Sequence, residues 1–264
     1  MNIVLIIAIV ALIAYLFLRK KAKPEVAAAE AQPANYKELL ETHIYYYRKL
    51  DDTAKSRFEQ YVNNFLAETH IESVGTEIND IDRVMVASSA VIPVFGFGEW
   101  RYKNLTNVIV YPDTFDNEFQ FEGGSRNIMG MVGSGYMNGQ MLLSRAALIK
   151  GFSKNNGKEN TGIHEFVHLL DKSDGVTDGV PENLIAHEYA MPWLQMMHSE
   201  MRRIEAGKSD INPYALTNEA EFLAVASEYF FEKPEQLESK HPELYKQLSR
   251  MFGQDPASPE NIIT

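Results

Sequence analysis

The run His164-Glu165-Phe166-Val167-His168 constrains this chain most, because its residues can act together only on a helix. Helical side chains four residues apart lie on one face, so His164 and His168 can bind the same Zn²⁺. Glu165 follows the first histidine and can take a proton from a water on that metal. Without a third ligand, the same pattern would describe a helix with two exposed histidines and a solvated glutamate.

A zinc site needs a third protein ligand, and this chain has no cysteine to supply one. The segment 217–228 (TNEAEFLAVASE) offers carboxylates instead. Asn218 is a good helix N-cap, and Glu221, three residues later, completes a capping-box pattern. Glu221 and Glu228 share one helix face with apolar Val225, where a cation would stabilise a carboxylate. Helix capping is the alternative role for Glu221, and for Glu228 a structural or histidine-orienting role is favoured over ligation.

Asp171 lies on the same helical face as the two histidines, three residues after His168. Its carboxylate either accepts the second ring N–H of a ligand histidine, which would orient that ring, or caps the chain where it leaves the helix. The sequence leaves both roles open.

The first 18 residues, Met1–Leu18, carry no charged side chain and are rich in leucine and β-branched residues. This length just spans the hydrocarbon layer of a membrane, so we expect a transmembrane anchor in contact with the lipid bilayer. A signal peptide is the alternative, but it would carry its positive charges before the apolar run. Here they follow it, which predicts a single-pass protein of the cytoplasmic (inner) membrane with its N-terminus outside and its catalytic domain in the cytoplasm. These charges are Arg19, Lys20, Lys21 and Lys23.

Composition divides the chain into an anchor with a basic flank (1–23), a small polar linker (24–35) and one globular domain (36–264). The whole chain has a net charge of −11, but residues 24–264 hold 21 basic and 36 acidic residues, a net charge of −15. No direct nucleic-acid binding is expected, because that needs a basic surface.

The hydrophobic pattern of the globular part predicts more helices than strands, without regular alternation, which indicates an α+β fold. We expect a mostly helical domain with a small sheet. The expected helices cover 36–50, 51–68, 81–95, 157–170, 181–206, 218–232 and 241–252, and the expected strands cover 107–111, 118–121 and 140–144.

These motifs resemble the glucose-regulated zinc metallopeptidases typified by the Mlc titration factor. The resemblance covers most of residues 36–255 and is strongest in HEFVHLLD (164–171) with DGVP (178–181), and in AEFLAVASEYFFEKP (220–234). The site also resembles the catalytic domain of anthrax lethal factor, which has a similar histidine helix and a TNEAEF-like segment.

Both resemblances imply a zincin-like fold with one Zn²⁺ per chain, and Glu221 rather than Glu228 as the third ligand. They also imply an edge strand near Gln140–Ser144 that holds a peptide by strand addition. The lethal-factor pattern further points to Tyr214, seven residues before Glu221, as a donor to the developing oxyanion. A loop tyrosine without a catalytic task is the alternative.

The function expected from these observations is a membrane-anchored zinc peptidase that acts on peptides or proteins, with Glu165 as general base. A regulatory protein that sequesters a repressor partner, with weak or conditional peptidase activity, is the alternative that the family resemblance carries. A cell-wall amidase is a third reading, which would require the domain to lie outside the membrane.

Overall fold

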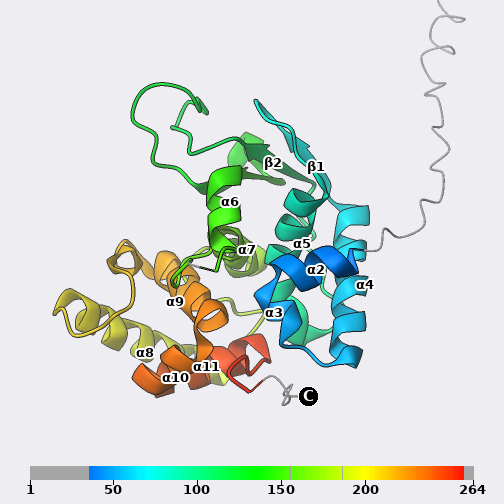
Figure 1. Ribbon diagram of the computed structural model, residues 1–264. Helices are drawn as coiled ribbons and strands as arrows, with labels where there is room; N and C mark the ends of the chain where they lie inside the picture. Colours follow the sequence, from blue (N-terminus) through cyan, green and yellow to red (C-terminus); the bar gives the residue numbers. More distant parts are fainter. Residues whose placement is uncertain (1–35, 155, 186, 259–264) are drawn as a thin grey trace, which may run out of the picture. The chain divides into compact units, whose positions relative to one another are not determined.

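A small mixed sheet lies beside the helices of this protein (Figure 1). The computed structural model describes residues 36–154, 156–185 and 187–258. In these residues the sheet has the strand order β1-β2-β4-β3, in which β1, β2 and β4 run parallel and β3 runs antiparallel to β4. The strands are β1 (His70–Ser73), β2 (Asn107–Tyr111), β3 (Gly130–Val132) and β4 (Gln140–Ser144).

The edge of the sheet nearest the histidine helix is β3, which corrects the expectation that Gln140–Ser144 forms the edge strand. That segment, β4, is an inner strand paired with β2 and β3. β3 was not expected because it lies in a glycine-rich stretch without alternating apolar residues. The strand expected at 118–121 is wrong, since a turn at Glu118 is followed by irregular residues in the long loop between β2 and β3 (Figure 1).

Helices make up most of the remaining described chain, so the prediction of a mostly helical α+β protein with a small sheet is confirmed. The short helices α6 and α10 were not expected, and the helix expected over 36–50 is broken by Ile44, which is extended and fully buried. The helices are α2 (Lys37–His43), α3 (Tyr45–Arg48), α4 (Asp52–Glu68), α5 (Asp80–Val94), α6 (Arg145–Gly151), α7 (Thr161–Asp171), α8 (His187–Glu205), α9 (Glu219–Glu232), α10 (Pro234–Lys240) and α11 (Pro242–Phe252).

The two faces of the sheet contribute to different apolar clusters, because successive strand residues point to opposite sides. Val108 and Val110 of β2 are fully buried in the main core, which they share with the helices. Tyr111 and Leu142 point to the other face, where Phe115 from the long loop covers them. Helix α7 packs against α5 and α9 and contacts β3, so the core fixes this helix beside the sheet edge.

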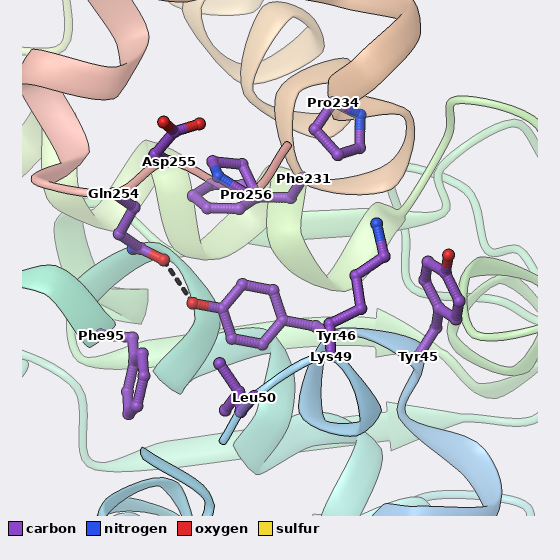
Figure 2. A pocket seen from close by; sticks show the side chains of 10 residues that line it. All are labelled: Tyr45, Tyr46, Lys49, Leu50, Phe95, Phe231, Pro234, Gln254, Asp255 and Pro256. Atoms are coloured by element: carbon purple, nitrogen blue, oxygen red, sulfur yellow. Dashed lines mark hydrogen bonds between the residues drawn. The ribbon is translucent and has the colours of Figure 1, made fainter. Parts of the chain in front are cut away.

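The end of the described chain is tied to α3 and α5 at a narrow pocket (Figure 2). The hydroxyl of Tyr46 donates a hydrogen bond to the side-chain oxygen of Gln254, and the amide of Gln254 donates to the carbonyl oxygen of Ile92 at 2.9 Å. Figure 2 shows the Tyr46 ring between Leu50 and the chain end. These bonds hold the residues after α11 against the N-terminal helices.

The structure contradicts the predicted localisation as a single-pass membrane protein. None of the helices within residues 36–154, 156–185 and 187–258 is long and apolar enough to cross a membrane. The segment Met1–Leu18, on which the single-pass prediction and the bilayer contact rested, lies outside the described residues, as do the predicted basic flank and linker. The described residues belong to one compact unit, Asn35–Thr264.

Candidate metal centre

The predicted histidine helix forms as α7, and both of its ends follow from local sequence. Asn160 is the N-cap, and its side-chain oxygen accepts a hydrogen bond from the backbone N–H of Ile163 at 3.2 Å. Ile163, Phe166, Val167 and Leu170 are buried in the core. The opposite side of the helix therefore presents His164 and His168 toward α9.

Helix α9 brings Glu221 to the two histidines. The side chain of Asn218 caps this helix by accepting the N–H of Glu221 at 2.9 Å, as the sequence predicts. The carboxylate of Glu221 lies 3.0 Å from Nε2 of His164 and 3.5 Å from Nε2 of His168. Glu221 thus takes part in the helix cap through its backbone, while its carboxylate faces the histidines.

The donor atoms of His164, His168 and Glu221 all lie within 4.8 Å of one another. The two Nε2 atoms are 3.1 Å apart. Ligand atoms of a tetrahedral Zn²⁺ are separated by about 3.4 Å, as metal–ligand distances of about 2.1 Å require. Two imidazoles and one carboxylate are also a donor set that zinc accepts. The arrangement therefore fits a zinc ion.

Glu165 is buried beside the edge strand, with a residue exposure of 6%. Burial raises the pKa of its carboxyl group, although His164 and His168 oppose this effect. A Cβ atom on Gly130 of β3 would lie 2.6 Å from both Cγ and Oε1 of Glu165. The absence of a side chain at Gly130 therefore allows the carboxylate of Glu165 to lie directly against the edge strand.

Glu228, two turns after Glu221 on α9, contacts the outer side of His164. One of its carboxylate oxygens lies 2.7 Å from Nδ1 of His164, and the other accepts the backbone N–H of Asn160. A proton held on Nδ1 by this contact leaves the lone pair of Nε2 directed toward His168 and Glu221. Of the roles that the sequence allows for Glu228, this geometry matches the one in which its carboxylate orients a histidine ring.

Asp171 makes no hydrogen bond to either histidine in the described structure. Its Oδ2 accepts the backbone N–H of Gly179 at 2.9 Å, and its Oδ1 is buried without a hydrogen-bond partner among the described residues. Burial raises the pKa of Asp171 to about 6. Asp171 can orient a histidine or cap the chain that leaves the helix, and the geometry matches the second role.

Tyr214 lies on a 3-10 helix, η4 (Pro213–Leu216), at the rim of the histidine cluster. Its ring centroid is 6.2 Å from that of His164, and 54% of the residue is exposed. Partial burial raises the pKa of the phenol, and the negative charge of Glu221 adds to the effect. No hydrogen bond of its hydroxyl group joins it to another described residue, so the group is free to contact a bound molecule.

The electrostatics of the cluster favour a bound cation. Burial lowers the pKa of His164, but hydrogen bonds to Glu221 and Glu228 outweigh it and raise this pKa to about 10. Burial raises the pKa of Glu221, but hydrogen bonds to the two histidines outweigh it and lower this pKa to about 2. Three carboxylates, including that of Glu165, thus surround two imidazoles, and a cation would compensate their charge.

Two residues that shape this centre were missed as site residues. Gly130 belongs to a glycine-rich stretch in which no local pattern distinguishes it from its neighbours. Asn160 stands where a helix N-cap is expected, but its backbone bond to Glu228 joins positions 68 residues apart. Neither contact has a local sequence signal.

Comparison of the sequence with known proteins identifies its family. The model of the family "glucose-regulated metallo-peptidase M90" matches residues 17–253, so the chain belongs to this metallopeptidase family, as the sequence motifs predicted. An uncharacterized protein of Synechocystis is 26% identical over 235 residues, which are 85% of each chain.

Proteins named Mlc titration factor A are also similar to this chain. The one from Pectobacterium atrosepticum is 32% identical over 191 residues, which are 68% of this chain and 71% of that protein. The one from Cronobacter sakazakii is 29% identical over 221 residues, which are 78% and 82% of the two chains. The family implies a metal ion, and the name of these relatives indicates a regulatory partner for them.

Proposed function

We propose that this protein is a zinc-dependent peptidase with a zincin-like catalytic domain at residues 36–264. The observation that carries the proposal is the convergence of His164, His168 and Glu221, with donor atoms within 4.8 Å, directly beside Glu165. These three residues would hold one Zn²⁺ per chain. When bound, the metal supplies Lewis acidity, which polarises the scissile carbonyl and makes water more acidic.

The outer edge of β3, with which no described strand pairs, provides a place for an extended peptide. In antiparallel pairing, alternate residues direct their backbone groups toward the partner strand. Ser144 donates to Met129, and Gly133 donates to Gln140, so the intervening Gly130 and Val132 direct their N–H and C=O groups to the open edge. A peptide added to this edge would pass next to Glu165, which lies against Gly130.

Glu165 acts as general base and then as general acid in this mechanism. Its carboxylate takes a proton from the attacking water, whose oxygen forms a bond to the carbonyl carbon. The C–N bond then breaks, and Glu165 delivers the proton to the leaving amine nitrogen. The raised pKa of Glu165 supports this exchange, because a base with a pKa closer to neutrality both accepts and releases a proton.

Tyr214 and Glu228 assist this reaction at two different places, the carbonyl oxygen of the substrate and the ring of His164. The exposed hydroxyl of Tyr214 donates a hydrogen bond to the carbonyl oxygen as negative charge develops there. Glu228 keeps the proton of His164 on Nδ1, so that Nε2 can donate its lone pair to the metal.

The test is cleavage of a peptide library by zinc-loaded protein and by Glu165→Gln. We expect the substitution to lower kcat by about 100-fold or more while zinc content is unchanged, because it removes the proton acceptor and no ligand. Glu243→Gln is the matched control, since Glu243 is an exposed glutamate of α11. Equal cleavage by Glu165→Gln and wild type would contradict the catalytic assignment.

A regulatory function is the second candidate, favoured by the similarity to proteins named Mlc titration factor A. This chain would then bind a regulatory protein partner, with weak or conditional peptidase activity. A pull-down with the Glu165→Gln protein separates the two functions. Zinc-dependent capture of a protein such as Mlc, without peptide cleavage by wild type, would favour regulation over catalysis.

A further inference from the structure

A cavity of about 580 Å³ lies where β3 and α7 both end. Val132 and Gly133 line it from the sheet edge, and Leu169 and Lys172 line it from the helix side. Trp100 and Tyr102 add aromatic walls, and the cavity has no role in the mechanism described above.

Lys172 connects this cavity to the metal centre. It is the C-cap residue of α7 and still has helical backbone angles. Because it follows His168 by four residues, as His168 follows His164, all three side chains share one face of the helix. Lys172 therefore lies just over one helical turn, or about 6 Å along the axis, beyond the second histidine.

The ammonium group of Lys172 has no counter-charge in the described part of the chain. Its Nζ donates to the carbonyl oxygen of Gly133 at 3.0 Å and lies 3.5 Å from the amide oxygen of Asn138. Both partners are neutral, and no described carboxylate lies within ion-pair distance. An ammonium group has three donors, so Lys172 retains a donor for a further acceptor.

The other charged residues that line the cavity are exposed to solvent, whereas Lys172 is partly buried. Arg101 forms an ion pair with Glu68 at 3.1 Å, and its side chain is 73% exposed. Lys103 and the acidic Glu99 are also exposed. A carboxylate stabilises a half-buried ammonium group with neutral partners more strongly than it stabilises an exposed ammonium group.

The cavity adjoins the end of β3, so it would lie near one end of a peptide paired with that strand. Glu165 contacts Gly130 at the start of β3, and Lys172 contacts Gly133, the residue directly after β3, so the two contacts are three residues apart in the chain. Three residues of an extended chain span about 10 Å. A peptide whose scissile bond faces Glu165 would thus place the residue about three positions away at the cavity.

We propose that Lys172 binds a carboxylate of the substrate in this cavity, so that the preferred peptides are acidic about three residues from the scissile bond. This inference rests on the proposed peptidase function and names its substrate class. The carboxylate is either an Asp or Glu side chain or the C-terminal carboxylate of a short peptide.

The test uses zinc-loaded protein and peptides that carry one Glu at successive positions on either side of the cleaved bond. Each peptide is compared with its Gln counterpart, and C-terminal acids are compared with C-terminal amides. We expect kcat/KM to be about tenfold higher for the acidic peptide at one position, mainly through KM, as for a charge-assisted hydrogen bond. The Glu/Gln and acid/amide pairs identify which carboxylate is bound.

The variant Lys172→Gln should remove this preference, Lys172→Arg should retain most of it, and Lys246→Gln on the exposed side of α11 should leave it unchanged. Glu165-dependent cleavage without any preference for acid, or an equal loss for Glu and Gln peptides in Lys172→Gln, would overturn the carboxylate site alone. Absence of Glu165-dependent cleavage of any peptide would overturn the peptidase function and this inference together.

Discussion

The carboxylate of Glu228 has two partners that belong to different parts of the centre. It contacts Nδ1 of His164 at 2.7 Å and accepts the backbone N–H of Asn160, the residue that caps α7. One side chain thus holds both the ring of a proposed ligand and the start of the helix that carries it. At the scale of single residues, the centre depends on such supporting contacts as much as on the three groups that would bind metal.

The variant Glu228→Gln tests this supporting role. A glutamine can still accept from His164 through its oxygen, but its NH₂ group cannot accept the N–H of Asn160. We expect zinc affinity to fall by about tenfold, as for other partners of ligand histidines. Competition with a chromophoric chelator measures the affinity, and an unchanged value would show that zinc binding does not depend on the charge of Glu228 or on its contact with Asn160.

Gly130→Ala tests the close approach of the edge strand to Glu165. The added Cβ would lie 2.6 Å from Cγ and Oε1 of Glu165, so the carboxylate must move. Because a long side chain can give way, we expect little loss of stability but a fall in kcat of roughly 10- to 100-fold. Peptide cleavage and zinc content are measured together, with Ser134→Ala at an exposed position as control. Wild-type kcat would contradict this geometry.

At the scale of elements, a buried charge cluster joins α8, α11 and the loop before η4. Nδ1 of His241 lies 3.1 Å from Glu200, and Nε2 lies 2.8 Å from Asp210. The hydrogen bond to Glu200 is the largest cause of a raised pKa at His241, and the pKa values of Glu200 and Asp210 are lowered because their hydrogen bonds outweigh burial. Asp210 also accepts from Lys158, Tyr229, Gln236 and Lys240.

This cluster predicts how stability depends on pH. The pKa of His241 is raised in the folded state. Its contribution to the free energy of unfolding is therefore fully present below the unfolded pKa of about 6.5, and it is lost as pH rises through the folded pKa. Glu200 and Asp210 act in the opposite direction, since their contribution to the free energy of unfolding is lost as pH falls through their lowered pKa values. Urea unfolding should therefore show that His241→Gln is more destabilising at pH 6 than at pH 9. An equal effect at both pH values would contradict a charged His241.

The elements differ in how far local sequence predicts them. Helices α4, α7 and α9 carry clear apolar spacing and capping residues, and they form where the spacing predicts. β3 has three residues, and its pairing with β4 is set by the tertiary structure rather than by its own pattern. The break at Ile44 likewise reflects burial of that side chain between α2 and α3, which helical spacing alone does not reveal.

At the scale of the whole molecule, the predictable part of the site is the part built within single helices. His164, Glu165 and His168 follow from spacing on one helix, and Glu221 from the start of another. The approach of Gly130 to Glu165 and the cavity beside Lys172 depend on how the sheet edge meets α7. Those contacts join residues far apart in the chain, so no local pattern could predict them.

The most direct test of the account is a zinc titration of the full chain, wild type and His168→Ala. We predict one tightly bound zinc ion per wild-type chain and loss of that tight binding in His168→Ala, because two remaining protein ligands do not complete a zinc site. His70→Ala serves as the control, since His70 is exposed on β1. Wild-type protein that binds no zinc, or His168→Ala protein that binds it as wild type does, would contradict the proposed centre.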